Sequence, residues 1–511
     1  MKILFAMSSP EYLRFYDATV LELASRGHDV VIAVNAIREG KPARLDGVGE
    51  HPRVSVAGLI PPRRDAWEPL ARAVRGTQDF VRYLHPELAG AARLRQRVKY
   101  QALPWVLAPL DRISSVSPRI VAWTMRTLAR VERAIPVSDD VLRFLEAQQP
   151  DLVAVSPLVE PASEQIDIVR AAQARGIRVA TLVASWDNLS NKGDLRIAAD
   201  LIAVWNETQK REAIALHRVA PEQVTVTGAQ AFDRWFDRSV SRPRHAFCRD
   251  VGLGDDRPFV LYTGSSIFIA RAEVEVPFVR RWIEALRRSA DPAIRDLAVL
   301  VRPHPYNGRA WPSDALADLP GVTVWPRGGF DPADERQRAG FYDSLFHASA
   351  IVGINTSAMI EAAIVGRPVL SIETPEFAGT QEGTLHYRYL LPENGGFLRV
   401  SSNVDDHLRQ LADVLERPEA ARAELARFVG QFIRPHGVDR PATPILVDAL
   451  ERYAVSPRPA PVPARRAAAA LVWPLTRVRP LLVSGAARRR VQVERKRGMV
   501  RKASAVASGK S

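Results

Sequence analysis

The sequence has almost no cysteine and no long apolar run. Cys248 is the only cysteine among 511 residues, which excludes a disulfide framework within the chain and a zinc site built on cysteines. This usage fits a reducing compartment. No uninterrupted apolar stretch reaches ~18 residues, the length of an ordinary transmembrane helix. The opening apolar stretch, residues 2–7, is too short for the apolar region of a signal peptide. We therefore expect a cytoplasmic protein.

Acidic residues are nearly missing from the end of the chain. Residues 456–511 hold 14 Lys and Arg but a single acid, Glu494, so this tail carries +13 of the net charge of +14. The tail also holds apolar islands at 467–474 and 480–483, flanked by arginines. Basic residues around Trp and Leu favour an anionic membrane surface, such as the inner face of the plasma membrane, over a nucleic acid. A flexible, solvated tail is the alternative.

The composition of the rest is that of a globular protein. The chain is 47% apolar and 25% charged, which allows a sizeable core and excludes a disordered or fibrous chain. At ~150 residues per domain the length suggests about three domains, or two large ones and a tail.

Short apolar runs alternate with helical patterns in two series, which predicts an α/β fold of two doubly wound, Rossmann-like domains. The first domain is predicted to span 1–240, with strands at 2–7, 29–34, 152–155, 179–183, 201–204 and 224–226. An Arg-rich helical insertion is expected at about 61–150, either as a solvated face or as a second surface for membrane or acceptor. A linker is expected at 239–249. The second domain is predicted to span 241–455, with strands at 259–262, 297–301, 322–325, 350–354 and 368–372.

Ligands of open parallel sheets bind beyond the carboxyl ends of the strands. In the second domain these positions carry polar loops that suit a diphosphate, because small hydroxyls, free amides and cations can hold its oxygens. The candidate donor-binding residues are Gly264, Ser265, Ser266, Arg302, His304, Asn355, Thr356, Ser357 and Glu361. Thr356 or Ser357 is also a good helix N-cap, and Glu361 could instead form a surface salt bridge. The loop at 374–386 is also polar enough to face a ligand.

The equivalent loops of the first domain carry carboxylates. Glu11 and Asp187 are the candidate general bases, although either could simply cap a helix. Arg14, Trp186 and Asn188 lie beside them in the sequence and are predicted to face the acceptor.

Several of these residues resemble a known family. Gly27-His28 before the second strand and the segment from Glu361 to Val369 are similar to the GT-B glycosyltransferases. The segments 302–305, 353–370 and 228–233 further resemble bacterial surface-polysaccharide transferases and the CDP-glycerol glycerophosphotransferase group. The resemblance implies two domains facing across a cleft, with the acceptor on the first and a nucleotide-sugar donor on the second.

Carried over by position, the resemblance gives roles to the second-domain residues. Gly264 and Ser265 would face the donor diphosphate, Arg302 and His304 would add positive charge or hydrogen bonds, and Thr356 and Ser357 would cap the phosphates. Glu361 would face the ribose, and His304 joins Asp187 and Glu11 among the catalytic candidates. The Asp-Tyr-Ser-Ser of the glycerophosphotransferases is replaced by residues 353–357, and the His-x-Glu-x-Gly-x-Arg element of the related 2-epimerases is absent.

The sequence thus predicts a membrane-peripheral glycosyltransferase that builds a cell-envelope polysaccharide or modifies a lipid-linked acceptor. The expected donor is a nucleotide diphosphate sugar, with no cofactor, no metal site and no nucleic-acid partner; no strong Asp-x-Asp metal motif is present. Two alternatives are transfer of a polyol phosphate from a CDP-linked donor and a non-catalytic protein that recruits glycan machinery to the membrane.

Overall fold

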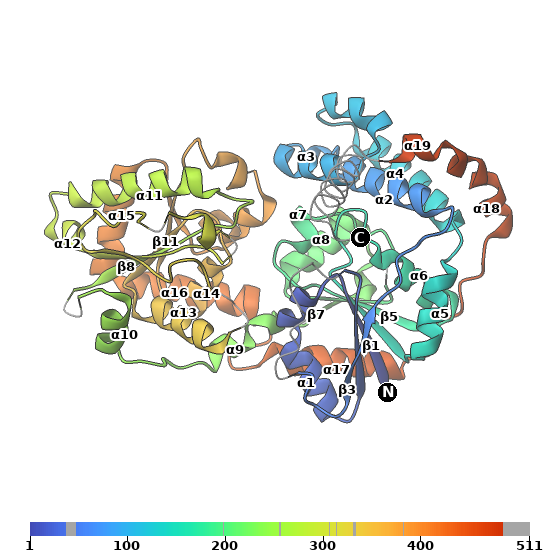
Figure 1. The fold of residues 1–511 in the computed structure, drawn as a ribbon, viewed down its shortest axis with the longest axis horizontal. Helices are drawn as coiled ribbons and strands as arrows, with labels where there is room; N and C mark the ends of the chain where they lie inside the picture. The colour runs from blue at the N-terminus through green and yellow to red at the C-terminus, as the bar shows by residue number, and fades with distance from the viewer. Residues whose placement is uncertain are drawn as a thin grey trace, which may run out of the picture. The chain divides into compact units, whose positions relative to one another are not determined.

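The computed structural model describes residues 1–36, 48–197, 199–254, 257–305, 307–312, 314–330, 334–381 and 383–483. The chain divides into two compact units (Figure 1). Unit 1 comprises Met1–Val226 together with the chain from Pro444 onward, and unit 2 comprises Thr227–Thr443. The division therefore falls at 226/227 and 443/444, whereas the sequence placed it at 240/241 and 455/456.

Unit 1 is built on a parallel sheet of seven strands in the order β3-β2-β1-β4-β5-β6-β7. The strands are β1 (Lys2–Met7), β2 (Asp29–Val34), β3 (Val54–Leu59), β4 (Leu152–Ser156), β5 (Arg178–Leu182), β6 (Leu201–Val204) and β7 (Val224–Val226). Alternate side chains of β1 enter different cores: Leu4 and Ala6 pack on one face of the sheet, and Ile3 and Phe5 on the other. Burial on both faces explains why the strands are continuous apolar runs.

Helices cover both faces of this sheet. They are η1 (Pro10–Phe15), α1 (Asp17–Ser25), α6 (Gln165–Ala174), α7 (Asn188–Asn191), α8 (Glu207–His217), η4 (Pro221–Gln223) and α17 (Ala442–Val455). Leu446, Val447 and Leu450 of α17 are buried in the same core as α1 and β1. The chain after residue 443 therefore belongs to the first unit, because its apolar face completes that core.

The predicted helical insertion is present between β3 and β4. It consists of α2 (Glu68–Arg82), η2 (Pro86–Leu88), α3 (Ala92–Gln101), η3 (Trp105–Arg112), α4 (Pro118–Ala134) and α5 (Asp139–Gln148). A buried ion network holds it: Arg75 of α2 pairs with Glu132 of α4 at 2.7 Å and with Asp167 of α6 at 2.9 Å.

Unit 2 contains a parallel sheet of six strands in the order β10-β9-β8-β11-β12-β13. The strands are β8 (Phe259–Thr263), β9 (Ala298–Arg302), β10 (Val322–Val324), β11 (Ala350–Gly353), β12 (Val369–Ile372) and β13 (Arg399–Ser401). Its helices are η5 (Gln230–Phe232), α9 (Asp233–Phe236), α10 (Arg244–Val251), α11 (Ala272–Arg287), α12 (Pro292–Arg295), η6 (Gly308–Ala310), α13 (Glu335–His347), α14 (Ala358–Ile364), η7 (Ala378–Thr380), η8 (Leu385–Leu390), η9 (Pro392–Asn394), α15 (Val404–Glu416), α16 (Pro418–Phe428) and η10 (Val429–Ile433).

The predicted linker at 239–249 lies entirely within unit 2. Its second half forms α10, in which Phe247, Cys248 and Val251 are buried. Asp343, itself fully buried, accepts hydrogen bonds from the backbone and the hydroxyl of Ser241. Because this stretch is polar in composition, the sequence analysis did not predict its helix, although the buried side of that helix is apolar.

The tail is folded over the part that the structure describes. It forms α18 (Arg466–Val472), η11 (Trp473–Val478) and α19 (Arg479–Leu482), which pack along α2, α4 and η3 of the insertion. The expectation of a flexible tail is therefore wrong for 466–482, whereas residues 484–511 lie outside the described chain. Within the described ranges, no helix combines the length and the apolar character needed to cross a bilayer.

Candidate functional site at the carboxyl edges of the two sheets

The chain of unit 2 reverses its direction of travel across the sheet between β8 and β11. It runs from β8 outward to β9 and β10, and then returns to the other side of β8 to form β11, β12 and β13. In open parallel sheets this switch point is where ligands bind. The loops that follow β8 and β11 contain most of the predicted donor-binding residues, so the fold brings them to one edge.

The loops after β8 and β9 are in direct backbone contact. Gly264 donates its N–H to the carbonyl of Arg302 at 2.8 Å. A Cβ at Gly264 would lie 2.8 Å from the backbone nitrogen of His304 and 3.0 Å from the Arg302 carbonyl oxygen. Only glycine allows this approach without a backbone shift. The predicted pair of loops at 264–266 and 302–305 is therefore one structural unit.

A buried glutamate that the sequence analysis missed joins these loops. Glu275, in the first turn of α11, accepts hydrogen bonds from Ser265 N at 2.7 Å, Tyr262 Oη at 3.2 Å and Asn307 Nδ2 at 3.4 Å. Burial raises the pKa of Glu275 to about 8. Its position in the first turn of the helix that follows the Gly-Ser-Ser loop was the available signal, but a charged residue on a helix ordinarily indicates a solvated face.

Two buried polar atoms at this edge have no hydrogen-bond partner among the residues that the structure describes. They are Asn307 Oδ1 and Asn355 Oδ1. Nearly all buried polar groups in proteins are paired with protein, water or ligand. These atoms therefore provide hydrogen-bonding capacity that a polar ligand or ordered water would use.

The loops after β11 and β12 are joined by amide side chains. Asn355 donates through Nδ2 to the Thr380 carbonyl at 2.7 Å and to Thr384 Oγ1 at 3.1 Å. Gln381 donates to the Ile372 carbonyl at 3.0 Å. The polar loop predicted at 374–386 is thus held against the β11 loop. Asn355 therefore holds the loops after β11 and β12 together, and it is also a candidate ligand contact.

The helix after β11, α14, has only a weak side-chain cap at its N-terminus. Ser357 occupies the N-cap position of α14 but is exposed and makes no capping hydrogen bond, while Thr356 Oγ1 accepts weakly from Ala358 N at 3.4 Å. Glu361 lies one turn further along α14 and is partly buried. Because α14 has seven residues, its N-terminus adds little field of its own.

Arg302 does not lie open to a ligand, which corrects the role expected for it. Its guanidinium is buried, donates to Ser344 Oγ at 2.7 Å and to the Gly340 carbonyl at 3.1 Å, and is enclosed by Trp325, Phe330 and Phe341 with ring centroids 4.6–5.1 Å away. Burial lowers the pKa of Arg302 to about 9. The cation packs against α13 instead of entering the loop edge. His304 and Ser266 remain at that edge and are partly buried.

In unit 1 the switch point lies between β1 and β4. Side chains from three loops meet there: Glu160, which the sequence analysis missed, accepts from Tyr12 Oη at 2.9 Å and from Lys192 Nζ at 3.1 Å. Burial and then the Glu160 charge raise the pKa of Tyr12. The sequence did not predict this cluster because Tyr12 and Glu160 are more than a hundred residues apart in the chain. Glu160 also lies in a mostly apolar segment, which does not suggest a site residue.

The predicted base Asp187 lies in the loop after β5 and has a defined setting. Asn188 receives the N–H groups of Ala184 and Ser185 on Oδ1, at 3.0 and 3.2 Å, and donates to Asp187 Oδ1 at 3.3 Å. Glu212 of α8 interacts electrostatically with Asp187: burial raises the pKa of Glu212 to about 8, Arg82 opposes this, and the Asp187 charge adds to it. Glu212 Oε2 is buried and has no hydrogen-bond partner in the described ranges.

The other predicted residues of unit 1 lie on neighbouring segments. Glu11 and Arg14 are on the 3₁₀ helix η1 that follows β1, where Glu11 is partly buried and Arg14 is exposed with its guanidinium 4.6 Å from the Phe15 ring. Trp186 is buried. The loops after β1, β4 and β5 therefore gather both candidate bases at one edge of this sheet, with Glu160 and Glu212 as additional carboxylates.

The helical insertion holds the loop after β5 in place. Arg82 of α2 donates to the Lys192 carbonyl at 2.8 Å, and Arg97 of α3 donates to the Asn191 carbonyl at 2.8 Å. Asp79 of α2 accepts from the backbone N–H groups of Ala162 and Asp194, both at 2.7 Å. The insertion thus fixes the loops after β4 and β5 through buried polar contacts.

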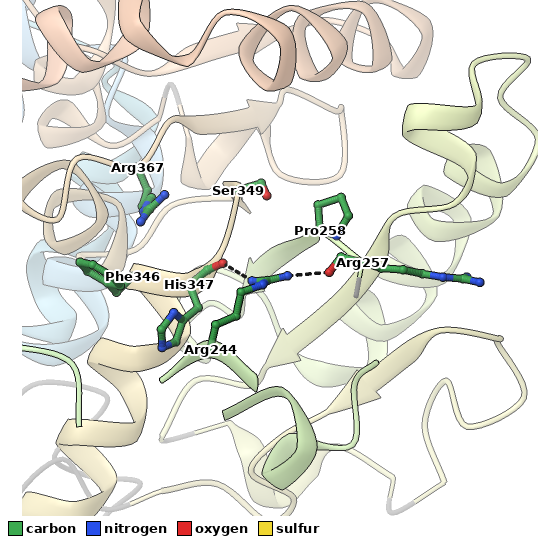
Figure 2. Close-up of a pocket in the computed structure, with 7 residues that line it drawn as sticks. All are labelled: Arg244, Arg257, Pro258, Phe346, His347, Ser349 and Arg367. Atoms are coloured by element: carbon green, nitrogen blue, oxygen red, sulfur yellow. Dashed lines mark hydrogen bonds between the residues drawn. The ribbon is translucent and has the colours of Figure 1, made fainter. Parts of the chain in front are cut away.

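A separate pocket of unit 2 lies away from these loops. Figure 2 shows its lining: Arg244, Arg257, Pro258, Phe346, His347, Ser349 and Arg367. Arg257 and Pro258 precede β8, Ser349 precedes β11 and Arg367 precedes β12. The pocket is therefore at the amino ends of the strands, and none of the predicted site residues lines it. Among the described residues, no group of three or more His, Cys, Asp or Glu is placed to hold a metal ion.

No protein-family model matches the chain, and no curated protein matches it in sequence. Solved structures do. A UDP-GlcNAc 2-epimerase of Neisseria meningitidis bound to UDP-GlcNAc is 14% identical, with a TM-score of 0.52 over 88% of this chain and 100% of that one. The MnaA–UDP structure of S. aureus is 14% identical, with a TM-score of 0.50 over 90% and 100%. The glycotransferase of kitacinnamycin is 13% identical, with a TM-score of 0.50 over 88% and 98%.

These likenesses establish the fold, which is the GT-B architecture of two doubly wound α/β domains. The predicted fold class is confirmed, and so is the resemblance to GT-B proteins on which it partly depended.

Proposed function

We propose that this chain is a glycosyltransferase that moves a sugar from a nucleotide diphosphate sugar to a cell-envelope glycan or lipid-linked acceptor. The observation that supports it most is the carboxyl edge of unit 2. There, closely packed glycine-containing loops at the switch point carry buried side-chain oxygens of Asn307 and Asn355 that have no hydrogen-bond partner within the described part of the chain. A diphosphate and a ribose are ligands that such atoms suit.

On the donor side, Gly264, Ser265, Ser266 and Thr356 would contact the diphosphate through backbone and hydroxyl groups. His304 would add a hydrogen bond or a positive charge, and Glu361 would bind the ribose diol. Ser357 is exposed and would act from the loop rim. Negative charge develops on the leaving diphosphate, and donors fixed before the reaction stabilise it without reorganisation. Arg302 supports this edge from behind and is not proposed as a ligand contact.

On the acceptor side, Asp187 or Glu11 would act as the general base. The carboxylate takes the proton of the acceptor hydroxyl as its oxygen attacks the anomeric carbon. The bond from that carbon to the diphosphate breaks, and the diphosphate leaves with the electron pair. Asn188 would orient Asp187, to which it donates at 3.3 Å. Trp186 and Arg14 would line the acceptor position.

The test is product analysis with labelled UDP-, GDP-, CDP- and dTDP-sugars and an envelope lipid extract as acceptor. We expect a glycoside from one donor, with Asp187→Asn or Glu11→Gln reducing kcat about 10²-fold or more if that carboxylate is the base. Asp29→Asn, an exposed carboxylate paired with Arg53, is the matched control. EDTA should leave the rate unchanged if transfer is metal-independent.

Other products would contradict the proposal in distinct ways. A phosphodiester formed from CDP-glycerol would identify a polyol phosphotransferase. Conversion of UDP-GlcNAc to its 2-epimer without an acceptor would identify an epimerase. Nucleotide binding with no turnover on any acceptor would leave a non-catalytic binding protein.

A further inference from the structure

Exposed apolar side chains concentrate on one region of unit 1. Among the described residues, more than half of the exposed large apolar side chains lie between residues 100 and 123 of the insertion or between 471 and 481 of the tail. Trp123 is 63% exposed and Leu471 is 82% exposed. Single exposed apolar residues are normal on a protein surface, but a concentration of this kind marks an interaction site.

The two segments lie side by side. In Figure 1 the tail helices run along the insertion, and α18 contacts α4 while α19 contacts η3 and α2. Trp473 of η11 packs edge-on against Trp67, with ring centroids 5.0 Å apart. Leu482 packs on the cluster that contains Leu70 and Val74. The outer surfaces of η3, α4, α18 and η11 therefore form one surface, here called the basic–apolar face.

Cations without partners surround the apolar side chains of this face. On α4, Arg119, Trp123, Arg126 and Arg130 follow helical spacing and are all exposed, opposite the buried Val121 and Met125. These three arginines have no ion-pair or hydrogen-bond partner among the described residues. The same holds for the exposed Arg466 and Arg477 on the tail segments.

No acid opposes these cations within 92–134 or 465–483. The only acids of these segments are Asp111 and Glu132. Asp111 is bound by Lys99 at 2.6 Å and Gln96 at 2.8 Å, and Glu132 is buried against Arg75. The charge of the face is therefore of one sign, and its acids are already neutralised.

We infer that the basic–apolar face docks unit 1 on an anionic lipid bilayer. An anionic bilayer satisfies both parts of the face at once: the interface takes up Trp and Leu side chains, and the lipid phosphates pair the arginines. A nucleic acid would use the cations but would leave Leu471 and Trp123 in water. Docking does not depend on the proposed transferase activity.

The location of the basic–apolar face indicates which class of acceptor the proposed transferase would use. The insertion that carries the face also holds the loop after β5, through Arg82, Tyr83 and Arg97 bonded to the carbonyls of Lys192 and Asn191 at 2.8–2.9 Å. A docked face would bring this loop near the bilayer surface. This inference about the acceptor rests on the proposed function. It favours an acceptor that is itself anchored in the membrane.

The test is co-sedimentation of the full chain with phosphatidylcholine vesicles, with and without phosphatidylglycerol, at low and high salt. We expect binding only to the anionic vesicles and weakening by salt. W123S/R126E/R130E and, separately, R466E/R477E should each weaken binding about tenfold or more, because each basic residue contributes appreciably near a charged surface. R336E/R427E is the control, because both arginines are exposed and lie on unit 2. Far-ultraviolet circular dichroism checks that every variant is folded.

Five results would overturn the inference. Equal loss in the R336E/R427E control would show that only overall charge matters. Loss confined to R488E/R489E/R490E would assign binding to the chain beyond the described tail. Equal binding to neutral vesicles, or none to either kind, would exclude an anionic docking face. Displacement of the vesicles by an oligonucleotide that binds more tightly and needs no Trp123 would indicate a nucleic-acid surface. If glycosyl transfer is absent but vesicle binding is intact, the proposed function is wrong and the docking inference still holds.

Discussion

At the residue scale, the buried ionisable groups of unit 2 organise the candidate site from behind. Glu275 joins the loops after β8 and β9, and Arg302 fills an aromatic enclosure beneath the β9 loop. Neither role is readable from the sequence. An arginine at the carboxyl end of a strand resembles a phosphate ligand, and only the positions of Trp325, Phe330 and Phe341 in the fold show that its guanidinium is enclosed.

Glu275 predicts a pH dependence of stability. Its pKa is raised from an ordinary 4.5 to about 8 by burial, so the folded protein holds this proton more tightly than the unfolded chain. The contribution is fully present below pH 4.5 and is lost as the pH rises toward about 8. Glu275→Gln cannot ionise, so the free energy of unfolding should fall less between pH 5 and 8 than in the parent protein. Urea unfolding at several pH values measures this, and identical slopes for both proteins would contradict a buried, protonated Glu275.

Arg302→Ala should act on stability more than on nucleotide affinity. The substitution empties a site enclosed by three aromatic rings and removes the donor to Ser344 and Gly340, so we expect a loss of about 2–4 kcal/mol. Arg280→Ala, on the exposed face of α11, should leave stability nearly unchanged because surface ion pairs contribute little. Thermal unfolding and nucleotide titration of both variants separate the two effects. Loss of nucleotide binding with unchanged stability would restore Arg302 as a ligand contact.

At the element scale, the sequence predicts every central strand but only two of the four edge strands, β7 and β10. Strands such as Lys2–Met7 and Phe259–Thr263 are buried on both faces and read as apolar runs. The two missed strands, β3 and β13, are at sheet edges and are mostly partly buried or exposed, so their apolar signal is weak. The candidate loops were found because they follow the well-predicted strands. Their braces, such as Glu160 and Asn307, depend on contacts across the sheet that spacing does not reveal.

Helix α17 is the element that most changes the predicted domain boundary. Leu450 is fully buried in the core shared with α1 and β1, so Leu450→Ala should destabilise unit 1 by about 2–5 kcal/mol. Leu471→Ala, at a side chain that is 82% exposed, is the matched control and should have little effect. Chemical unfolding followed by tryptophan fluorescence measures both. Equal effects would contradict the assignment of α17 to the first core.

At the scale of the whole molecule, the fold follows from two series of strand and helix, whereas the tail does not follow from composition. Its arginines and short apolar islands predict a solvated or membrane-bound segment, yet residues 466–482 pack on the insertion and leave part of their apolar surface outside. The amino-acid composition of residues 466–482 therefore predicts only the exposed surface of this segment. The inner contacts, such as Trp473 on Trp67, require the partner helices to be in place.

The most direct test of the central claim is calorimetric titration of the protein with UDP, GDP, CDP and dTDP, repeated on two glycine variants. Gly264→Ala places a Cβ 2.8 Å from a backbone nitrogen of the β9 loop, whereas Gly430→Ala meets only a side-chain methyl at 3.6 Å. If the switch-point loops of unit 2 bind the donor, one nucleoside diphosphate should bind, Gly264→Ala should weaken it at least about tenfold, and Gly430→Ala should leave it unchanged. Binding that survives Gly264→Ala, or no binding of any nucleoside diphosphate, would contradict the assignment of this edge as a nucleotide-sugar site.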